Sequence, residues 1–396
     1  MDSYLFFLAI MFLLAIFMQD RFVISLLYFF LSVFLIGRWW SLFAARRVKF
    51  LRTHPSRAFI GESIMTHLEV HNPGWLPLVW MRLQDHLPVE LATKGTFKRV
   101  ISLGPRRSLN FEYELFARKR GIYQVGPVQA ITGDLFGLAV EQHAVGAATS
   151  LVVFPSIHRM AHFSLPSLAP LGTLRTRQPL FEDPSRVRGK RDYQPGDSLR
   201  RIDWKTTASQ GRLQVKQFEP SISLETMIFL NLNLAEYDFR GRFEATELAI
   251  VAAASIANWV MLQRQAVGLV TNGLHAQASN QEFLPLPPRK GRSHLIHLLE
   301  MLAVVQAVEA MPFLTLISQQ RSRLAWGTTN ILITGSVPAN LFKEIFQSRQ
   351  AGMSLVLVVA GNVPDLGLVR QQSVYFRIPF YHLRHELELE SWRGLV

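Results

Sequence analysis

The chain has 396 residues, which is enough for two globular domains beside a membrane segment. Its formal net charge of +13 implies a basic surface that attracts anionic lipid, nucleic acid or an acidic protein. The sequence contains no cysteine, which excludes disulfides, thiolate metal sites and a cysteine nucleophile.

The N-terminal segment consists of two apolar runs, residues 4–18 and 22–36, separated by three polar residues. Each run of about 15 residues would form a helix of about 22 Å, somewhat short for a hydrocarbon core of about 30 Å. Trp39 and Trp40 extend the second helix to an interfacial anchor. The first run lacks the basic segment and the small-residue cleavage site of a signal peptide. We therefore predict a transmembrane helical hairpin in residues 1–47, with helices at about 4–18 and 22–40.

Basic residues follow the second run directly, whereas the turn between the runs carries one arginine and one aspartate. The basic residues are Arg38, Arg46, Arg47, Lys49 and Arg52. By the positive-inside rule, the protein is predicted to cross the plasma (inner) membrane twice, with both termini and the soluble domains in the cytoplasm. Anionic headgroups would gain about 1 kcal/mol per basic charge, so Arg46, Arg47, Lys49 and Arg52 are predicted to contact lipid.

Residues 48–155 alternate short strand-like runs with turn signals, spaced roughly ten residues apart, which predicts an antiparallel β-sandwich. Residues 156–187 contain scattered proline, serine and basic residues without periodicity, which indicates a linker. From residue 224 onward, apolar strands alternate with helices. The expected strands are 226–232, 267–271, 330–334, 354–359 and 374–378, and the expected helices are 244–262, 293–305 and 339–348. This alternation predicts a mostly parallel sheet covered on both faces.

Between the linker and the α/β domain lies the densest run of charge in the chain, within residues 188–223, which we call the cassette. Pro195, Gly196 and Asp197 are typical of a tight turn, and residues 212–218 alternate as a strand with two different faces. Two interpretations remain open. The charges brace a turn and a strand around one packed tryptophan, Trp204, or they present a docking surface. Exposed ion pairs contribute only about 0–1 kcal/mol each, so stability alone is a poor reason for so many.

The segments RDYQPGDSLRRIDW and LQVKQFE of the cassette closely resemble the signature of the bacterial domain-of-unknown-function 58 family. A second resemblance to this family lies in the β segment, at Arg120, Gly121, Tyr123, Gly126, Pro127, Asp134, Phe136, Gly137 and Leu138. We expect a structural role for these residues. The sequence departs from the family at Ala208-Ser209, where the family commonly has Ala-Arg.

The resemblance implies two membrane helices, a β-rich segment and a C-terminal α/β domain like the von Willebrand factor A domain, which is Rossmann-like. It also implies a role alongside MoxR-type AAA+ ATPases, in the assembly or maturation of envelope or multi-protein complexes. The expected domains are 1–47 (hairpin), 48–155 (β-sandwich), 156–187 (linker), 188–223 (cassette) and 224–396 (A-like domain).

Domains of the A type typically hold Mg²⁺ with an Asp-x-Ser-x-Ser motif after the first strand. The aligned positions here are Asn231, Asn233 and Ala235, and a second motif aspartate falls on Gly335. Glu236 lies close by but outside the motif spacing. Because the aligned positions carry no carboxylate, we predict a degenerate site with no metal and no cofactor, and metal-independent partner binding.

Catalytic motifs are weak throughout the sequence. His294 and His297, and the group His382, His385 and Glu386, lack zinc-site spacing, and no nucleophile elbow, phosphate loop or dinucleotide fingerprint is found. Asp192, Asp197 and Asp203 could serve as paired carboxylates of a hydrolase, but each has an arginine close in sequence. Nucleic-acid binding is the other alternative, although no basic platform with interleaved aromatic residues is present.

These observations favour a membrane-anchored, cytoplasm-facing scaffold that binds proteins and is not an enzyme. The predicted interaction surface consists of Arg191, Asp197, Arg200, Arg201 and Asp203 around the turn at Gly196, braced by Tyr193 and Trp204. A hydrolase that uses the cassette carboxylates, or a basic nucleic-acid-binding protein, remains the alternative.

Overall fold

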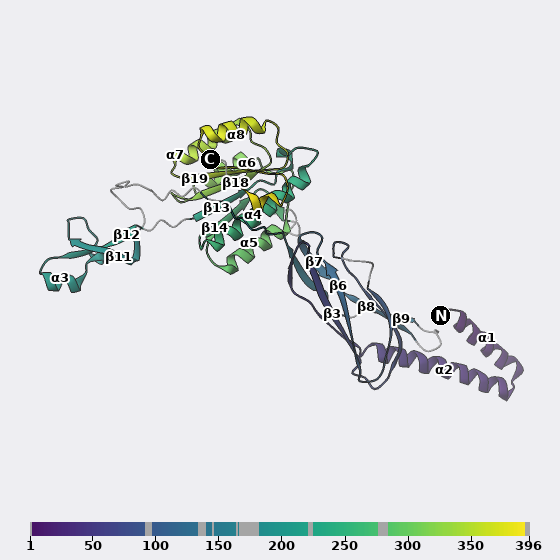
Figure 1. Cartoon of the computed structure of the whole chain (residues 1–396). Coiled ribbons are helices and arrows are strands. Elements are labelled where there is room, and N and C mark those ends of the chain that lie inside the picture. Colours follow the sequence, from purple (N-terminus) through teal and green to yellow (C-terminus); the bar gives the residue numbers. More distant parts are fainter. Residues whose placement is uncertain are drawn as a thin grey trace. The chain divides into compact units, whose positions relative to one another are not determined.

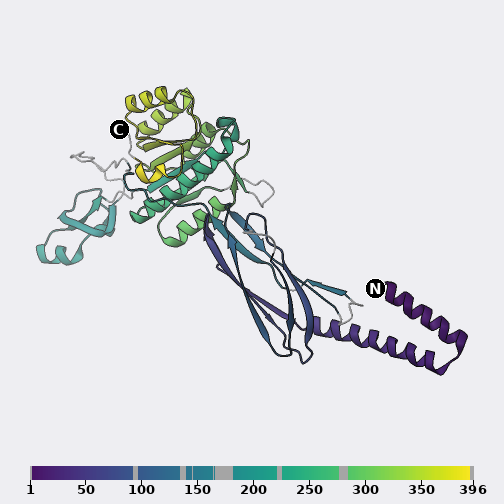
Figure 2. The same cartoon turned by 45° about the vertical axis from the view of Figure 1, so that its right-hand side comes forward.

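The computed structural model describes residues 2–91, 97–133, 140–144, 146–163, 165, 182–220, 225–275 and 284–392 (Figures 1 and 2). The chain divides into two compact units, one of Met1–Ser156 with Leu299–Val304 and one of Ile157–Leu298 with Val305–Val396. Most of the predicted linker lies outside the described residues. So do four residues of the family pattern in the β segment, Asp134, Phe136, Gly137 and Leu138.

Two helices begin the first unit, α1 (Asp2–Met18) and α2 (Arg21–Ala45), and they lie side by side in both views (Figures 1 and 2). The Tyr4 hydroxyl donates a hydrogen bond to the carbonyl of Phe30 at 3.1 Å, which ties the start of α1 to α2. Asp20 caps α2 by accepting from the backbone N–H of Phe22 at 3.1 Å. By length and composition α2 can cross a membrane, whereas α1 is a shorter apolar helix.

The described strands of the first unit form three sheets, ordered β1-β3-β6, β2-β10-β7 and β5-β4-β8-β9. Their bounds are β1 Lys49–Thr53, β2 Arg57–Phe59, β3 Ser63–His71, β4 Leu78–Asp85, β5 Lys98–Leu103, β6 Ser108–Phe116, β7 Gly121–Val125, β8 Val128–Gly133, β9 Val140–Ala144 and β10 Thr149–Phe154. Leu68 and Val70 of β3 share a buried cluster with Met81 and Leu83 of β4. Two sheets therefore pack face to face, as a β-sandwich requires.

Arg52 corrects one prediction about lipid contact. Its side chain is only 4% exposed and forms an ion pair with Asp85, whose side chain is fully buried. The Arg52 guanidinium also donates to the carbonyl of Val125 at 2.6 Å, and the Tyr113 hydroxyl donates to Asp85. Burial, followed by the contact with Asp85, raises the pKa of Tyr113 above its ordinary value. Arg52 therefore braces the sandwich core, and the prediction that it contacts lipid is wrong.

The second unit contains a six-stranded sheet with the order β16-β14-β13-β18-β19-β20, parallel except at β16. The strands are β13 Glu225–Leu230, β14 Ala266–Thr271, β16 Leu286–Arg289, β18 Thr329–Thr334, β19 Ser354–Ala360 and β20 Phe380–Leu383. The helices of this unit are α4 Arg242–Leu262, α6 Phe313–Arg321, α7 Ala339–Gln350, α8 Leu366–Tyr375 and α9 Glu388–Ser391, while α5 (Arg292–Val304) is divided between the two units at Leu299. Short strands β15 (Leu274–His275) and β17 (Val305–Gln306) pair beside it.

Both faces of the sheet are covered. Residues of α6, α7 and α8 form one buried cluster with the sheet, and α4 packs on the opposite face (Figure 1). By length and apolar composition α4 could also cross a membrane, but most of it is buried. It is therefore the core helix of the α/β unit.

Two segments of the second unit differ from the sequence-based expectation. The predicted strand 374–378 is wrong, because α8 continues to Tyr375 and the edge strand is β20. At the start of the predicted linker, Phe163 is only 4% exposed and packs against Trp259 and Tyr381, with ring centroids 5.1 and 5.0 Å apart. Phe163 therefore belongs to the α/β core, since an aromatic side chain buries a large apolar surface.

Candidate functional site

The cassette is built on a two-stranded antiparallel sheet of β11 (Glu182–Asp192) and β12 (Gln214–Pro220). A 3₁₀ turn, η1 (Leu199–Arg201), and a short helix, α3 (Trp204–Gln210), connect the two strands. Ile202 and Val215 are 6% and 2% exposed and form a β-bridge, so they are the small apolar core of this element. The predicted strand at residues 212–218 is confirmed in its main part, whereas β11 was not predicted.

An arginine–aspartate clamp fixes the turn between β11 and η1. The guanidinium of Arg191 donates to both carboxylate oxygens of Asp197, at 2.7 and 2.6 Å. The backbone N–H of Gln194 donates to the same carboxylate at 2.9 Å, and Gly196 adopts a φ of 108°, which favours glycine. The hydrogen bond from Arg191 is the main reason that the pKa of Asp197 lies below its ordinary value. Arg191 and Asp197 therefore hold the shape of the turn.

Asp203 connects the second half of the cassette to β11. Its carboxylate caps α3 by accepting from the backbone N–H of Thr206 at 3.2 Å, and it forms an ion pair with Lys190 at 2.9 Å. The contact with Lys190, followed by the backbone hydrogen bond, lowers the pKa of Asp203 to about 2. Like Arg191 and Asp197, Asp203 has a structural partner within the cassette.

The carboxylates of the cassette do not have the properties of a catalytic pair. Asp192 accepts from the side-chain amide of Gln214, while Asp197 and Asp203 hold basic partners. A general base works best with a pKa near the operating pH, whereas the pKa values of Asp197 and Asp203 are lowered. The geometry therefore lends no support to the hydrolase alternative.

Two apolar side chains of the cassette face solvent. Leu199 and Trp204 are 67% and 69% exposed, beside the exposed Arg200, Arg201 and Lys205. The prediction that Trp204 is packed as a brace is wrong, because Ile202 and Val215 already fill the small core and Trp204 is the first residue of α3. Tyr193, the other predicted brace, is half-buried. The sequence did contain a signal for the start of α3 at Trp204, because aspartate is a preferred N-cap residue and Asp203 precedes Trp204.

The second candidate site lies at the carboxyl ends of β13 and β18. In open α/β sheets, ligands bind at the carboxyl ends of the strands, at the point where the strand order reverses. Here β13 is that point, because β14 and β18 flank it on its two sides. Asn231 follows β13 and is fully buried, and its amide N–H groups donate to Glu236 at 2.7 Å and to the Thr334 hydroxyl at 2.9 Å. Its amide oxygen accepts from the Asn272 side chain at 3.0 Å.

Glu236 belongs to this site, although its position in the sequence does not match the metal motif. The 3₁₀ turn η2 (Leu234–Glu236) folds its carboxylate back, so that it accepts from Asn231, from the Asn233 side chain at 3.3 Å and from the backbone N–H of Phe313 at 3.1 Å. Ala235 of the motif is exposed. The sequence spacing missed Glu236 because it does not anticipate the tight turn.

A tyrosine closes the remaining space at this edge. Tyr237 is buried and its hydroxyl donates to the carbonyl of Asn231 at 2.6 Å. A Cβ atom at Gly335, the position of the second motif aspartate, would lie 2.0 Å from the Tyr237 ring. Burial raises the pKa of Tyr237 above its ordinary value, so this hydroxyl remains a donor at neutral pH. We call these residues, Asn231, Asn233, Glu236, Tyr237, Asn272 and Thr334, the sheet-edge network.

Two of the histidines considered for metal binding contact backbone carbonyls. His294 donates to the carbonyl of Val267 at 2.8 Å, and His382 donates to that of Gly361 at 2.9 Å. Glu386 instead lies 3.2 Å from His158. Among the described residues, no group of three or more His, Asp or Glu side chains could hold a metal ion.

Comparison with known proteins adds a family to this geometry. Residues 189–324 match the family model "Protein of unknown function DUF58". YeaD of Bacillus subtilis is 24% identical over 342 residues, which cover 82% of this chain and 81% of YeaD. The part of the chain that is shown to match the DUF58 family is therefore residues 189–324. The DUF58 match includes most of the cassette and all of the sheet-edge network except Thr334.

Other relatives and solved structures add little to the DUF58 assignment. Rv1480 of Mycobacterium tuberculosis is 34% identical over 104 residues, 26% of this chain and 30% of Rv1480. The CARDB domain of PF1109 from Pyrococcus furiosus is 14% identical and covers 27% of this chain and 91% of that domain, with a TM-score of 0.21. Proximal thread matrix protein 1 of the mussel byssus is 10% identical and covers 43% and 45%, with a TM-score of 0.31. Such low TM-scores carry no argument about fold or function.

Proposed function

We propose that the chain is a membrane-anchored, non-enzymatic scaffold that docks a protein partner through the cassette. The observation that carries the proposal is the exposure of Leu199 and Trp204 on a segment that two ion pairs hold in place. Binding hot spots are enriched in Trp and Arg side chains. Side chains that are already positioned lose less conformational freedom on binding, so such a surface suits recognition.

The chemistry of the cassette also indicates what kind of surface the partner has. Arg200 and Arg201 follow Leu199, and Lys205 follows Trp204, so basic groups border both exposed apolar side chains. Complementary charge around an apolar centre gives specificity and speeds association. We therefore expect the partner to offer an apolar pocket bordered by carboxylates.

The wider role rests on three further arguments. The length and composition of α2, with the exposed Arg46, Arg47 and Lys49 after it, support a two-pass anchor in the plasma (inner) membrane with the soluble units in the cytoplasm. The sheet order and the position of Asn231 support a von Willebrand factor A-like domain with a degenerate metal site. The family resemblance supports a MoxR-type AAA+ ATPase as the partner, in the assembly or maturation of envelope or multi-protein complexes.

The proposal is tested by chemical cross-linking in native membranes, followed by purification of the full-length chain. We expect the wild type to capture an AAA+ ATPase and the variant Leu199→Ser/Trp204→Ala to lose it. A matched control is Leu368→Ser/Tyr375→Ala, which removes an exposed aliphatic and an exposed aromatic side chain from α8. Equal capture by both variants, or no captured protein with the wild type, contradicts the proposal.

A further inference from the structure

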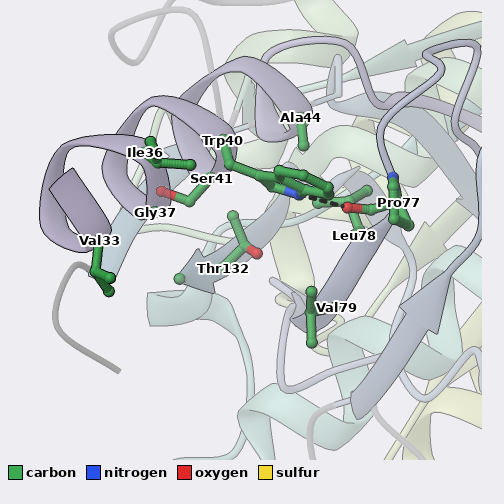
Figure 3. Close-up of a pocket in the computed structure, with 11 residues that line it drawn as sticks. Val33, Ile36, Gly37, Trp40, Ser41, Ala44, Pro77, Leu78, Val79 and Thr132 are labelled. Carbon is green, nitrogen blue, oxygen red and sulfur yellow. Dashed lines mark hydrogen bonds between the residues drawn. The ribbon is translucent and has the colours of Figure 1, made fainter. Parts of the chain in front are cut away.

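An apolar cavity of about 250 Å³ lies between α2 and the sandwich (Figure 3). Residues 77–79, at the start of β4, and Thr132 and Gly133 of β8 form one wall. One face of α2 forms the other wall, with the residues Val33, Ile36, Gly37, Trp40, Ser41 and Ala44. These residues recur at intervals of three and four, so they follow a single stripe along three turns of the helix.

The polar side chains that line this cavity already have partners. The Trp40 indole N–H donates to the carbonyl of Pro77 at 3.0 Å, as Figure 3 shows, and the Ser41 hydroxyl donates to the carbonyl of Arg38 at 3.1 Å. The Thr132 hydroxyl donates to the carbonyl of Trp80 at 2.6 Å. The cavity therefore presents apolar surface to an occupant, and an apolar chain suits it.

The stripe on α2 joins the apolar run of the helix to the sandwich. Ile36 is 59% exposed and belongs to the run that is long and apolar enough to cross a membrane, whereas Ser41 and Ala44 are buried against the sandwich. If α2 spans the bilayer, as the proposed function holds, the cavity begins in the hydrocarbon layer and ends outside it. An apolar chain from the bilayer can then enter along the helix, pack against Leu78 and Val79 in the cavity wall and shield the half-buried Val79 from water.

Basic and aromatic side chains surround the end of the sandwich next to α2. The stem of Arg47 lies beside Gly74 and its guanidinium lies 4.1 Å from the centre of the Phe43 ring. Trp75, in the loop before β4, is 60% exposed, and Gly74 of this loop accepts a backbone hydrogen bond from Arg106 at 3.1 Å. Tryptophan prefers the headgroup region of a bilayer, so Trp75 suits that environment.

Four exposed arginines therefore lie at this end of the sandwich, Arg46, Arg47, Arg106 and Arg107. None of the four forms an ion pair with another part of the described chain. Guanidinium groups bind phosphate through paired hydrogen bonds, and juxtamembrane basic clusters attract anionic lipid.

We propose that this end of the sandwich is a binding site for one anionic phospholipid. An acyl chain occupies the cavity between α2, β4 and β8, and the phosphate of the headgroup contacts the arginines near Trp75. The lipid thereby fills the space between α2 and the sandwich and contacts both the membrane helix and the first soluble domain.

The test uses the full chain in phosphatidylcholine vesicles with a small fraction of phosphatidylglycerol that carries a diazirine near the end of one acyl chain. After illumination, mass spectrometry locates the labelled residues. We expect label on Leu78 and Val79, in addition to the α1 and α2 residues that any surrounding lipid reaches. A probe with the same acyl chain and a phosphatidylcholine headgroup should label these two residues much more weakly.

A matched pair of variants tests the cavity itself. Gly37→Leu places a side chain in the cavity and should abolish the label on Leu78 and Val79. Ser32→Leu makes a comparable change at an exposed position of the same helix and should leave it unchanged. The unfolding temperature of both variants in detergent verifies that a lost label does not come from misfolding.

A second matched pair tests the headgroup contact. Arg106→Gln/Arg107→Gln should lower the label on Leu78 and Val79 at least about tenfold, because two basic groups near the anionic headgroup are removed. Arg118→Gln/Lys119→Gln changes the charge equally beyond the other end of β6 and should have no effect.

Three other outcomes would overturn the inference or its basis. Label confined to α1 and α2 means that the helices are embedded but that no lipid occupies the cavity. Cross-links from the cavity to a second copy of the chain mean that protein fills it. Absence of label from α1 and α2 as well contradicts the membrane anchor of the proposed function.

Discussion

The sheet-edge network and the cassette lie on the same chain, yet they use polar side chains in opposite ways. At the sheet edge, Asn231 is buried and its amide groups bond to other side chains, with Tyr237 covering the backbone behind it. In the cassette, ion pairs fix the backbone while Leu199 and Trp204 remain exposed. At the sheet edge, the polar groups form hydrogen bonds within the protein. In the cassette, the polar groups hold the backbone so that apolar side chains are exposed to solvent.

The difference shows that the location typical for ligands in an α/β sheet need not be the binding site. The amide N–H groups of Asn231 and both oxygens of Glu236 already have hydrogen-bond partners inside the protein, and giving up such a partner to a ligand costs free energy. The exposed Trp204 of the cassette gives up only contact with water. Binding is therefore expected at the cassette, and the following variants test each half of this comparison.

The largest effect is expected for Asn231→Asp, which replaces an amide donor by a carboxylate facing Glu236. An uncompensated buried charge costs about 3 kcal/mol or more, so the unfolding midpoint in urea should fall markedly with EDTA present. The exposed Asn340→Asp is the control and should change stability by less than about 0.5 kcal/mol.

The same variant tests whether an ion belongs at the sheet edge. With two carboxylates and the Thr334 hydroxyl close together, Asn231→Asp offers the oxygen ligands that Mg²⁺ prefers, and Mg²⁺ should restore part of its stability. The wild type should show no shift with Mg²⁺. A shift of the wild type would mean that the network opens to accept a metal ion.

Gly335→Ala should destabilise the α/β unit by about 2 kcal/mol, because the new methyl group would lie 2.0 Å from the Tyr237 ring and force it to move. Gly367→Ala in α8 is the control, since its Cβ would meet no atom within 4 Å. That change should be neutral or stabilise the helix slightly. Urea unfolding with equal costs for both variants would contradict the tight contact at the sheet edge.

Asp203→Ala should loosen α3 without unfolding the α/β unit, because it removes both the N-cap and the partner of Lys190. Amide hydrogen exchange in residues 204–210 is expected to accelerate about tenfold. Asp203→Asn keeps the capping oxygen and should show a smaller change. Indistinguishable exchange in the wild type and Asp203→Ala would mean that the cassette is held by other contacts.

The smallest effect is a dependence of cassette order on pH. The folded pKa of Asp203 is about 2, below its value of about 3.9 in an unfolded chain. Ionised Asp203 therefore stabilises the folded cassette above about pH 4, and this contribution disappears as the pH falls through about 2. Hydrogen exchange of residues 204–210, corrected for the intrinsic rate, should accelerate over this window in the wild type and not in Asp203→Ala.

Much of the architecture could be predicted from periodicity. The alternation of apolar strands and helices after residue 224 indicated a mostly parallel sheet, which the structure confirms. The prediction that Arg52 contacts lipid was wrong because Arg46, Arg47, Lys49 and Arg52 were treated as one basic cluster. The alternation of β1 separates its members, with Lys49 and Leu51 exposed and Phe50 and Arg52 turned inward.

The candidate sites were harder to predict, because their geometry depends on short turns. The turn η2 returns Glu236 to a site from which its sequence position excluded it. Similarly, Asp203 begins a helix, and this turns Trp204 to the surface. Neither turn has a hydrophobic period, so the available signals were the capping residues, Asp203 before Trp204 and Asn233 three residues before Glu236.

The most direct test of the central claim compares one aromatic residue from each region. Trp204→Ala removes the exposed ring of the cassette, and Phe239→Ala removes a ring that is 79% exposed in the loop after Tyr237. The measurement is the affinity of the full chain in lipid nanodiscs for the ATPase captured from native membranes. We expect Trp204→Ala to weaken binding by at least about tenfold and Phe239→Ala to leave it unchanged. Loss of binding with Phe239→Ala and wild-type affinity with Trp204→Ala would contradict the claim and place the docking face at the sheet edge.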